Sequence, residues 1–538
     1  MFQGIANENL NQKKVLIIGG VAGGASAAAR LRRLCENAEI ILFEKDEYIS
    51  FANCGLPYYI GATIEDRDAL LVQTPDSMKK RFNIDVRINS EVVQVDPAAK
   101  IVTVNSKNNG VYQESYDYLV LSPGAKAIKP DIPGVDSDKI FTLRNIADTD
   151  AIKSYVDNHS VANAVVIGGG FVGVEMAENF KKRGISVTIV EAAPHILTNF
   201  DLDMATIVEK ELLKNEVNLI LGDGVSSFHE NDNKINIVLR SGKSINADLA
   251  VLAIGVTPNT AFIKNSGIKL GKRAHILVNE KMETNMEGIY AVGDAIEVVN
   301  FVTKQITAIP LAGPANKQGR IVADNIAGLN STYKGTQGSA IIKVFGLTAA
   351  VTGANERALK EINMPYQVIY LHPASHATYY PGAVQMDLKL IFNEDGKILG
   401  AQCIGADGVD KRIDVISTVI KLNGTVSDLT ELELSYAPPY SSAKDPVNMA
   451  GYVAEDFLCG ISHLTRWADL TPEQQRENIL LDVRTAKEFN DGHLEGALNI
   501  PVDSLRNRLN ELDKDKNITL YCQVGLRGYI ADRILSQH

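Results

Sequence analysis

Cys54 stands in a stretch whose residue types favour thiol chemistry, SFANCGLP at residues 50–57. A cysteine is nucleophilic only as the thiolate, and a thiol at the start of a helical segment gains from the positive end of the helix dipole. Free cysteines are also common in hydrophobic cores, so this residue alone does not separate a redox role from a packing role. A glycine-rich turn and an acidic strand end precede it, and this arrangement favours a redox cysteine beside a bound cofactor.

The segment before this stretch has the layout of a dinucleotide-binding unit. Residues 14–24 (KVLIIGGVAGG) predict an apolar strand that runs into a glycine-rich turn and then into a helix rich in Ala and Arg, and the next strand, IILFEKD, ends at Glu44. Glycines let the start of the helix approach a pyrophosphate, and the acid accepts a ribose hydroxyl. Val21 stands at the middle position between Gly19 and Gly24, so this copy departs from the GxGxxG pattern.

A second unit of the same kind keeps the full pattern. The segment AVVIGGGFVGVEMAENF places Gly168, Gly170 and Gly173 at the required spacing between a strand and a helix, and the following strand, VTIVEA, ends in Glu191. A carboxylate at this place favours a free ribose 2′-hydroxyl, hence NADH over NADPH. One glycine pattern is weak evidence, but two with a strand, a helix and a distal acid predict two dinucleotide-binding domains.

Length, charge and cysteine usage limit the class of protein. The 538 residues, with 45% hydrophobic and 22% charged side chains, predict a globular protein of three or four domains. A net charge of -11 argues against nucleic-acid binding, which needs a cationic surface. The amino terminus has no apolar signal region and no later run is long enough to span a bilayer, so we expect a cytoplasmic protein without membrane insertion. The cysteines are Cys35, Cys54, Cys403, Cys459 and Cys522. They are scattered and form no CxxC pair, so we expect no disulfide framework and no metal site.

The segment TNMEGIYAVGDA at residues 284–295 completes a recognisable set of motifs. With the two glycine-rich units, it resembles the flavoprotein pyridine nucleotide-disulfide oxidoreductase family over residues 14–458. The resemblance implies an α/β fold with two Rossmann-like domains, an α+β dimerisation domain and a homodimer. The implied domains are an FAD-binding domain at 12–125 and 256–335, an NAD-binding domain at 126–255 and a dimerisation domain at 338–458. We expect the following residues to bind FAD or NADH, with NADPH as an alternative: Gly19, Gly23, Gly24, Glu44, Lys45, Asn53, Gly124, Arg144, Gly168, Gly170, Gly173, Glu191, Gly255, Gly293, Asp294 and Pro310.

The carboxyl-terminal part resembles a different family. LLDVRTAKEFNDGHLEGALNIP at residues 480–501 and LYCQVGLRG at 520–528 resemble a rhodanese, or sulfurtransferase, domain, which implies that Asp482 and Arg484 are structural partners. The loop after Cys522 follows an apolar strand and precedes a helix, so its backbone N–H groups can stabilise a thiolate or a bound persulfide. The chain stops at His538, sixteen residues after this cysteine, so we expect the α/β rhodanese-like domain at 463–538 to be incomplete.

Cys54 has no partner cysteine at the spacing of the two-cysteine relatives, because Tyr59 stands five residues further on. It must cycle through a mixed disulfide, a persulfide or a sulfenic acid. The family branch with SFxxCG contains coenzyme A disulfide or persulfide reductases and NADH oxidases or peroxidases. The peroxidases carry a histidine where this chain has Ala22, which disfavours a peroxidase.

The leading hypothesis is an NADH-dependent flavoprotein that reduces coenzyme A disulfide or persulfide through Cys54. The resemblance implies that electrons pass from NADH through FAD to this thiol, that Tyr436 of the partner subunit protonates the departing thiolate, and that either Tyr379 or Tyr380 faces the site. A fused rhodanese-like domain favours a substrate with sulfane sulfur. The alternatives are an NADH oxidase that uses a cysteine sulfenic acid, and a sulfur carrier or redox sensor based on Cys522. Coenzyme A, as substrate or bound thiol, is expected at Ser26, Arg30, Arg33, Ser50, Asn53, Lys80 and Lys444.

Overall fold

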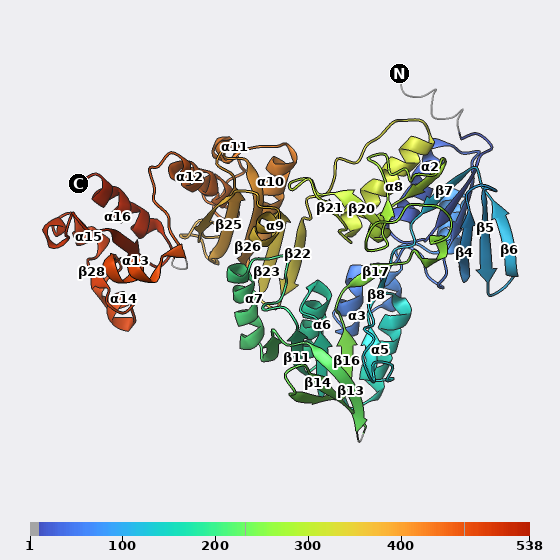
Figure 1. The fold of residues 1–538 in the computed structure, drawn as a ribbon, viewed down its shortest axis with the longest axis horizontal. Helices are drawn as coiled ribbons and strands as arrows, with labels where there is room; N and C mark the ends of the chain where they lie inside the picture. Colours follow the sequence, from blue (N-terminus) through green and yellow to red (C-terminus); the bar gives the residue numbers. More distant parts are fainter. Residues whose placement is uncertain (1–9, 232, 467–468) are drawn as a thin grey trace. The chain divides into compact units, whose positions relative to one another are not determined.

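The computed structural model describes residues 10–231, 233–466 and 469–538, and these form two compact units (Figure 1). The first unit contains the chain up to Thr198 together with Ala205–Gly338. The second contains the short segment Asn199–Met204 together with Ser339–His538. The chain therefore passes between the units three times.

Two parallel five-stranded sheets form the centre of the first unit. The first sheet has the order β19 (Ile289–Ala291), β7 (Tyr118–Leu121), β1 (Lys14–Ile18), β2 (Glu39–Phe43) and β3 (Asp85–Arg87). The second has the order β12 (Val217–Leu221), β11 (Ser186–Glu191), β10 (Asn163–Ile167), β16 (Leu249–Leu252) and β9 (Ile140–Thr142). In each sheet, the central strand leads into one of the two glycine-rich turns.

Smaller sheets and helices surround these two sheets. The small sheets are β4 (Ser90–Asp96), β5 (Ile101–Ser106) and β6 (Gly110–Ser115); β13 (Val225–Asn231), β14 (Lys234–Leu239) and β15 (Ser244–Ala247); β8 (Ala125–Ala127) with β17 (Val256–Pro258); and β18 (Ile276–Leu277), β20 (Ile296–Val299) and β21 (Ile306–Thr307). The helices are α2 (Gly23–Leu34), α3 (Leu56–Ile60), α4 (Pro75–Phe82), α5 (Ile146–Asn158), α6 (Phe171–Lys182) and α8 (Ala312–Ile326), together with α7 (Leu202–Lys214), whose first three residues belong to the second unit. Short 3₁₀ turns occupy η1 (Asn53–Gly55), η2 (Arg67–Leu70), η3 (Ala261–Ile263) and η4 (Gly293–Ala295).

The second unit contains one antiparallel and one parallel sheet. The antiparallel sheet has the order β22 (Ala340–Val344), β23 (Leu347–Gly353), β26 (Ile398–Gly405), β25 (Met386–Phe392) and β24 (Gln367–Leu371). Its helices are α9 (Glu356–Glu361), α10 (Val409–Lys421), α11 (Val426–Glu431) and α12 (Pro446–Leu458). The parallel sheet is β28 (Leu498–Asn499), β27 (Ile479–Asp482) and β29 (Ile518–Tyr521), with α13 (Pro472–Glu477), α14 (Ala486–Asp491), α15 (Val502–Leu505), η6 (Leu509–Glu511) and α16 (Leu526–Ser536).

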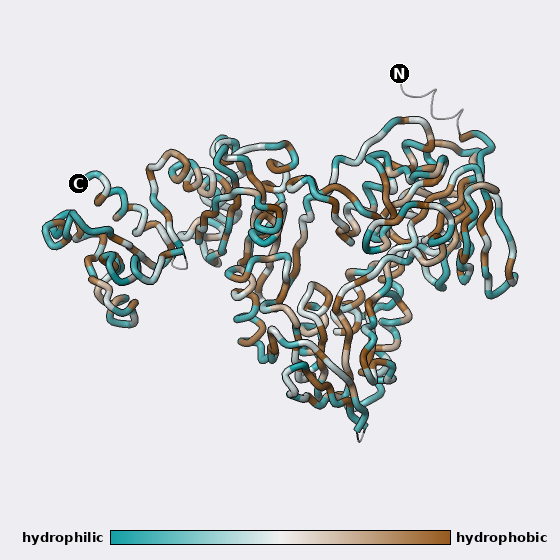
Figure 2. Tube along the Cα trace, in the orientation of Figure 1, coloured by the Kyte–Doolittle hydropathy of each residue, from teal (hydrophilic) through white to brown (hydrophobic). Residues whose placement is uncertain are grey.

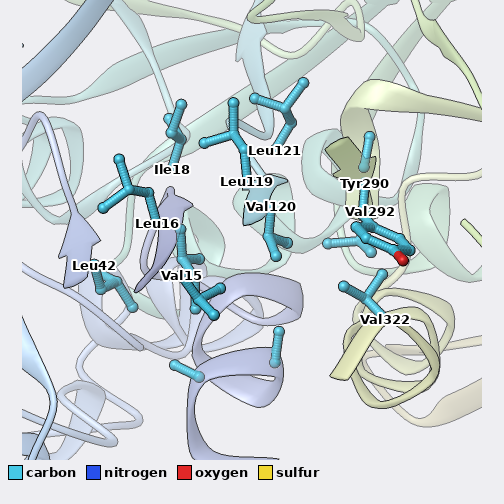
Figure 3. Packing of buried hydrophobic residues seen from close by; sticks show 14 of the residues in the cluster. Val15, Leu16, Ile18, Leu42, Leu119, Val120, Leu121, Tyr290, Val292 and Val322 are labelled. Carbon is cyan, nitrogen blue, oxygen red and sulfur yellow. The ribbon is translucent and has the colours of Figure 1, made fainter. Parts of the chain in front are cut away.

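The core of the first sheet explains why β1 is apolar along its length. Four consecutive residues of β1, Val15 to Ile18, are buried, because strands in the middle of a parallel sheet are covered on both faces. Side chains of β1, β7, β19 and α8 meet in this core (Figure 3). Along the chain, hydrophobic stretches coincide with strands of the sheets, and many of the connecting loops are hydrophilic (Figure 2). Helices α2 and α8 lie close together because Gly319 has no side chain: a Cβ there would be 2.3 Å from the Gly23 carbonyl oxygen.

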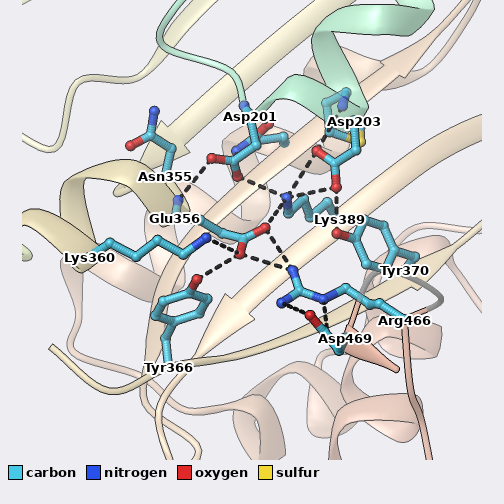
Figure 4. A network of polar contacts seen from close by, with 12 residues as sticks. Asp201, Asp203, Asn355, Glu356, Lys360, Tyr366, Tyr370, Lys389, Arg466 and Asp469 are labelled. Carbon is cyan, nitrogen blue, oxygen red and sulfur yellow. Dashed lines mark hydrogen bonds and ion pairs between the residues drawn. The ribbon is translucent and has the colours of Figure 1, made fainter. Parts of the chain in front are cut away.

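A buried lysine joins the segment Asn199–Met204 to the antiparallel sheet within the second unit (Figure 4). The Nζ of Lys389, which is fully buried, lies 2.9 Å from Asp201, 2.9 Å from Asp203 and 2.7 Å from Glu356. Burial alone would raise the pKa of Glu356, but Lys389, Tyr366 and Arg466 outweigh it and lower this pKa to about 2. A buried cation with three carboxylate partners therefore holds the segment Asn199–Met204 against the antiparallel sheet.

Among the residues that the structure describes, no helix combines the length and the apolar character needed to cross a bilayer.

Candidate active site

The first glycine-rich turn brings the acidic strand end onto the start of α2. The backbone N–H of Gly20 donates to Oε2 of Glu44 at 2.9 Å, and that of Asp46 donates to Oε1 at 3.2 Å. Burial raises the pKa of Glu44, although both N–H groups act against this rise. A Cβ at Gly24 would lie 1.9 Å from the Gly19 carbonyl oxygen, so glycine is required where the helix crosses the turn.

The segment around Asp294 forms a second wall of the same region. Arg144 pairs with Asp294 at 2.6 Å and donates through Nε to the Ala125 carbonyl oxygen at 3.0 Å. The backbone N–H of Gly293 donates to the buried side chain of Gln318 at 2.8 Å. Gln318 was not predicted from the sequence, since a glutamine inside a helix has no motif of its own.

Asn53 supplies an observation that points to a bound group here. Its side-chain oxygen Oδ1 is buried and has no hydrogen-bond partner among the described residues. A buried polar atom without a partner costs free energy, so such atoms usually bind a ligand or water. With the glycine turn and the acid at Glu44, this unpaired oxygen fits a dinucleotide cofactor between β1 and Asp294.

The second glycine-rich turn fits a pyrophosphate at the start of α6. Glu191 accepts from the backbone N–H groups of Gly169 and Ala193 at 2.6 and 2.7 Å, which holds its carboxylate at the turn. A Cβ at Gly170 would have no atom within 4 Å, so open space faces the N-terminus of this twelve-residue helix. A negatively charged group is favourable in such a place. This turn therefore fits NAD as the residue pattern predicts.

Cys54 lies in η1, directly before α3. This helix has only five residues, so its dipole contributes little. Partial removal from water raises the pKa of the Cys54 thiol, Glu175 and Asp294 raise it further, and Arg144 lowers it. Burial and the two carboxylates therefore outweigh the lowering of the thiol pKa that was expected from a helix N-terminus. Tyr59, which replaces a second cysteine, lies on α3.

Glu175 is a titratable side chain near Cys54 that was not predicted as a site residue. It lies on α6 and accepts a hydrogen bond from the hydroxyl of Tyr58 at 3.2 Å. Burial, together with the charge of Glu178, raises the pKa of Glu175 to about 7, against the opposing effect of the hydrogen bond from Tyr58. The position two residues after Gly173 is the only signal in the sequence that could have found it, since this places the carboxyl group on the helix of the glycine motif.

Cys54 lines a cavity of about 570 Å³ within the first unit. The lining residues are Val21, Ala22, Ala25, Ser26, Ala29, Arg30, Arg33, Ser50, Phe51, Ala52, Asn53, Cys54, Val72, Gln73, Met78, Phe82, Ala312, Asn316 and Arg320. Five of the expected substrate-binding residues, Ser26, Arg30, Arg33, Ser50 and Asn53, are in this lining. Lys80 lies on α4 but does not line the cavity, and Lys444 belongs to the second unit.

One wall of the cavity comes from α8, which was not predicted from the sequence. Ala312, Asn316 and Arg320 recur every four residues and so share one face of the helix. Ser26 donates to Asn316 at 2.7 Å, and Arg30 pairs with Asp324 of the same helix at 2.8 Å. The regular spacing of residues 312, 316 and 320 was visible in the sequence. Only the packing of α2 against α8 shows that this face of α8 lines the cavity.

The other predicted cofactor-binding residues lie in loops and turns of the first unit. Gly124 follows β7 and Gly255 precedes β17, both with a positive φ, while Gly23 begins α2. Lys45 follows Glu44, and Pro310 precedes α8; both are exposed. Contact of these residues with a cofactor stays a prediction.

Two predicted tyrosines of the second unit form a pair. The hydroxyl groups of Tyr379 and Tyr436 lie 2.8 Å apart although both side chains are exposed. Tyr380 is turned toward His376, with ring centroids 5.8 Å apart. The structure therefore associates Tyr379, and not Tyr380, with Tyr436.

Cys522 lies in a loop between β29 and α16. Its Sγ accepts from the backbone N–H groups of Gly525 at 3.2 Å and Gly528 at 3.3 Å. Arg484 pairs with the buried Asp482 at 2.6 Å, in the arrangement that the rhodanese resemblance implies. Two N–H groups directed at one sulfur suit a loop that holds a negatively charged, sulfur-loaded cysteine.

Comparison with known proteins identifies the family. Residues 13–319 match the family described as pyridine nucleotide-disulphide oxidoreductase, residues 339–446 match the dimerisation domain of that family, and residues 467–538 match the rhodanese-like domain. Coenzyme A disulfide reductase of Staphylococcus aureus is 40% identical over 446 residues, which are 82% of this chain and 100% of that protein.

Two solved structures are similar over nearly the whole chain. Reduced Bacillus anthracis CoADR-RHD has a TM-score of 0.96 and 52% identity, covering 98% of this chain and 95% of that chain. The NAD-dependent persulfide reductase from A. fulgidus has a TM-score of 0.92 and 36% identity, covering 97% of each chain.

The chain belongs to the pyridine nucleotide-disulphide oxidoreductase family, whose enzymes bind FAD and NAD(P), and it carries a carboxyl-terminal rhodanese domain. The predicted α/β fold class and the predicted enzyme class are confirmed by these matches.

Proposed function

We propose that this protein is an FAD- and NADH-dependent reductase of coenzyme A disulfide and coenzyme A persulfide, with Cys54 as its redox thiol. The observation that carries the proposal is the cavity at Cys54, which has three arginines in its lining and no second cysteine. A lone thiol must exchange with an external sulfur compound, and arginines suit the phosphates of coenzyme A. The names of the relatives reported above support the same substrates.

The residues of the chain divide the work between binding and bond exchange. Arg30, Arg33 and Arg320 orient the substrate phosphates, and the Cys54 thiolate attacks one sulfur of the disulfide. The S–S bond breaks, a coenzyme A thiolate leaves, and a mixed disulfide remains on Cys54. With a persulfide, attack on the inner sulfur gives the same mixed disulfide and releases hydrosulfide. Bound FAD, once reduced by NADH, would supply the electron pair that cleaves this mixed disulfide, which releases the second coenzyme A thiolate and restores the Cys54 thiolate.

The proposal includes an assembly and a second sulfur site. The protein acts as a homodimer in which Tyr436 of the partner subunit protonates the leaving thiolate. Cys522 carries sulfane sulfur, supported by the two N–H groups directed at its Sγ. The domain limits are those given above from the resemblance, and NADH is preferred because Glu191 is held at its turn. Free cysteines throughout support a reducing cytoplasm as the compartment.

The test is anaerobic oxidation of NADH with coenzyme A disulfide or coenzyme A persulfide as acceptor. We compare the parent protein with Cys54→Ser, and Cys459→Ser serves as the matched control because that cysteine is exposed and belongs to the second unit. We expect Cys54→Ser to lose at least ~10³-fold in kcat with both acceptors, while Cys459→Ser keeps parental activity. Equal activity of the parent and Cys54→Ser would contradict the proposal.

Two further measurements separate the alternatives. Oxygen consumption that coenzyme A persulfide does not affect would favour the NADH oxidase. Sulfide release that disappears in Cys522→Ser and survives in Cys54→Ser would favour the sulfur carrier.

A further inference from the structure

Two separate segments of the second unit carry the tyrosine pair. Tyr379 lies in the loop 372–385 between β24 and β25, and Tyr436 lies in the segment 432–445 between α11 and α12. The side chains are 74% and 48% exposed, yet their hydroxyls lie 2.8 Å apart. Exposed side chains lose conformational entropy when they hold such a contact, and an exposed hydrogen bond returns little. For the two hydroxyls to stay in contact, other contacts must therefore hold the backbones of both segments in place.

Arg412 is the residue that fixes both segments. It lies on α10 and is 1% exposed. Its Nη2 donates to the carbonyl oxygen of Ser375, in the first segment, at 2.9 Å. The same nitrogen lies 3.2 Å from the Ser441 hydroxyl and 3.1 Å from the Asp445 carboxylate, both in the second segment. One rigid guanidinium thus binds the two segments at once.

The surroundings of Arg412 complete this arrangement. The Ser441 hydroxyl donates to Asp445 at 2.6 Å, and the backbone N–H of Ala377 donates to the Ser441 carbonyl oxygen at 3.1 Å. Burial raises the pKa of Asp445, but Ser441, the Val447 N–H and the charges of Arg412 and Lys411 outweigh it and lower this pKa. Asp445 therefore stays ionised and balances the buried guanidinium.

We propose that Arg412 is a positioning residue that holds the hydroxyls of Tyr379 and Tyr436 together so that the two phenols act as one acid. The inference rests on the proposed function, in which Tyr436 of the partner subunit protonates the leaving thiolate. The Tyr436 hydroxyl gives its proton to the thiolate, which leaves a phenolate and a free thiol. Tyr379 donates its hydrogen bond to this phenolate, which then regains a proton from water. The hydrogen bond between the two hydroxyls, in which either oxygen can be the donor, raises the pKa of Tyr379.

The experiment uses the full-length, cofactor-loaded protein with the substitution Arg412→Lys. This change keeps the positive charge but removes the planar guanidinium whose N–H groups reach both segments. Arg357→Lys is the matched control, since Arg357 is 57% exposed and 3.9 Å from Glu361 in the same unit. We expect Arg412→Lys to lower kcat for coenzyme A disulfide about tenfold while KM changes less than about threefold. In Tyr379→Phe, the added Arg412→Lys is expected to cause little further loss, because both changes break the same contact.

Amide hydrogen exchange, measured without substrate, tests the same inference separately from the proposed function. Arg412→Lys is expected to speed exchange in both 372–385 and 432–445, and Arg357→Lys in neither. Parental kcat in Arg412→Lys, unchanged exchange, or multiplied losses in the double variant would overturn the inference. If Arg412→Lys does not fold, Ser441→Ala removes one contact of the guanidinium and is expected to lower kcat about threefold by the same route. A parent that does not reduce coenzyme A disulfide refutes the proposed function, while the exchange pattern still decides the role of Arg412.

Discussion

Tyr58 donates a hydrogen bond of 3.2 Å to the carboxyl group of Glu175, which has no other side-chain hydrogen bond within the described part of the chain. Nor does a described lysine, arginine or histidine form an ion pair with Glu175, whereas Glu178 on the same helix pairs with Lys182. A partly buried carboxyl group without a cation remains protonated to a higher pH than usual.

The burial of this carboxyl group makes stability depend on pH. The pKa of Glu175 is about 7 in the folded protein against 4.5 for an unperturbed glutamate, so the folded chain binds more protons between these values. The free energy of unfolding therefore falls as pH rises from about 4.5 to about 7. Glu175→Gln keeps an acceptor for Tyr58 and removes the charge. We expect it to raise the free energy of unfolding by ~1–3 kcal/mol near pH 8 and to change it little near pH 4.5, measured by denaturant titration. Glu216→Gln, at an 86% exposed carboxylate, is the control and should have no effect at either pH; a similar gain at both pH values for Glu175→Gln would disprove this explanation.

Gly170→Ala tests the pyrophosphate position at α6. The new methyl group enters open space, so the fold is expected to tolerate it, but it occupies the approach to the helix N-terminus. We expect KM for NADH to rise about tenfold or more with a melting temperature within about 2 °C of the parent. Gly173→Ala is the contrast, because its Cβ would lie 2.0 Å from the Gly168 carbonyl oxygen and should destabilise the protein. Parental KM in a well-folded Gly170→Ala protein would place the pyrophosphate elsewhere.

Arg30→Met tests the phosphate contacts of the cavity. The methionine keeps the apolar stem and removes the cation, so binding of a polyanionic substrate should weaken. We expect KM for coenzyme A disulfide to rise about tenfold, with a weaker dependence on salt than in the parent. Arg81→Met, on α4 and outside the cavity lining, is the control and should leave KM unchanged. The same KM shift in both variants would show that the effect comes from overall charge and not from the cavity.

Lys389→Met tests the buried network of the second unit. Removing the cation leaves Asp201, Asp203 and Glu356 close together without their common partner. We expect a loss of ~3–5 kcal/mol in the free energy of unfolding, because one partner of a buried ionic cluster is lost. Lys360→Met removes an exposed lysine 3.6 Å from Glu356 and should cost less than about 1 kcal/mol. Equal losses in the two variants would mean that the burial of Lys389 does not increase its contribution to the free energy of unfolding.

The sequence predicted the parts of the fold that depend on local patterns. The apolar run before Gly19 and the spacing of Gly168, Gly170 and Gly173 specify strand, turn and helix within a few residues, so both central strands are where they were expected. The loop of Cys522 is equally local, and its strand and helix follow the predicted order.

Contacts between distant segments could not be read in the same way. The cavity wall from α8 depends on its packing against α2, nearly 300 residues earlier in the chain, as in the hydrogen bond from Ser26 to Asn316. The raised pKa of Cys54 comes from burial and also from Glu175, and no spacing rule relates these two positions. The sequence predicted that the thiol gains from a helix N-terminus, because a motif shows that a helix starts but not how short the helix is.

The six residues Asn199–Met204 matter for the design of truncated forms of the protein. They stand in sequence between parts of the first unit, yet they supply two of the acids that surround Lys389. A fragment that starts at Ser339 would carry a buried ammonium group deprived of those acids. Expression of the dimerisation and rhodanese regions alone therefore calls for a linker that restores this short piece, or for replacement of the lysine by an apolar side chain.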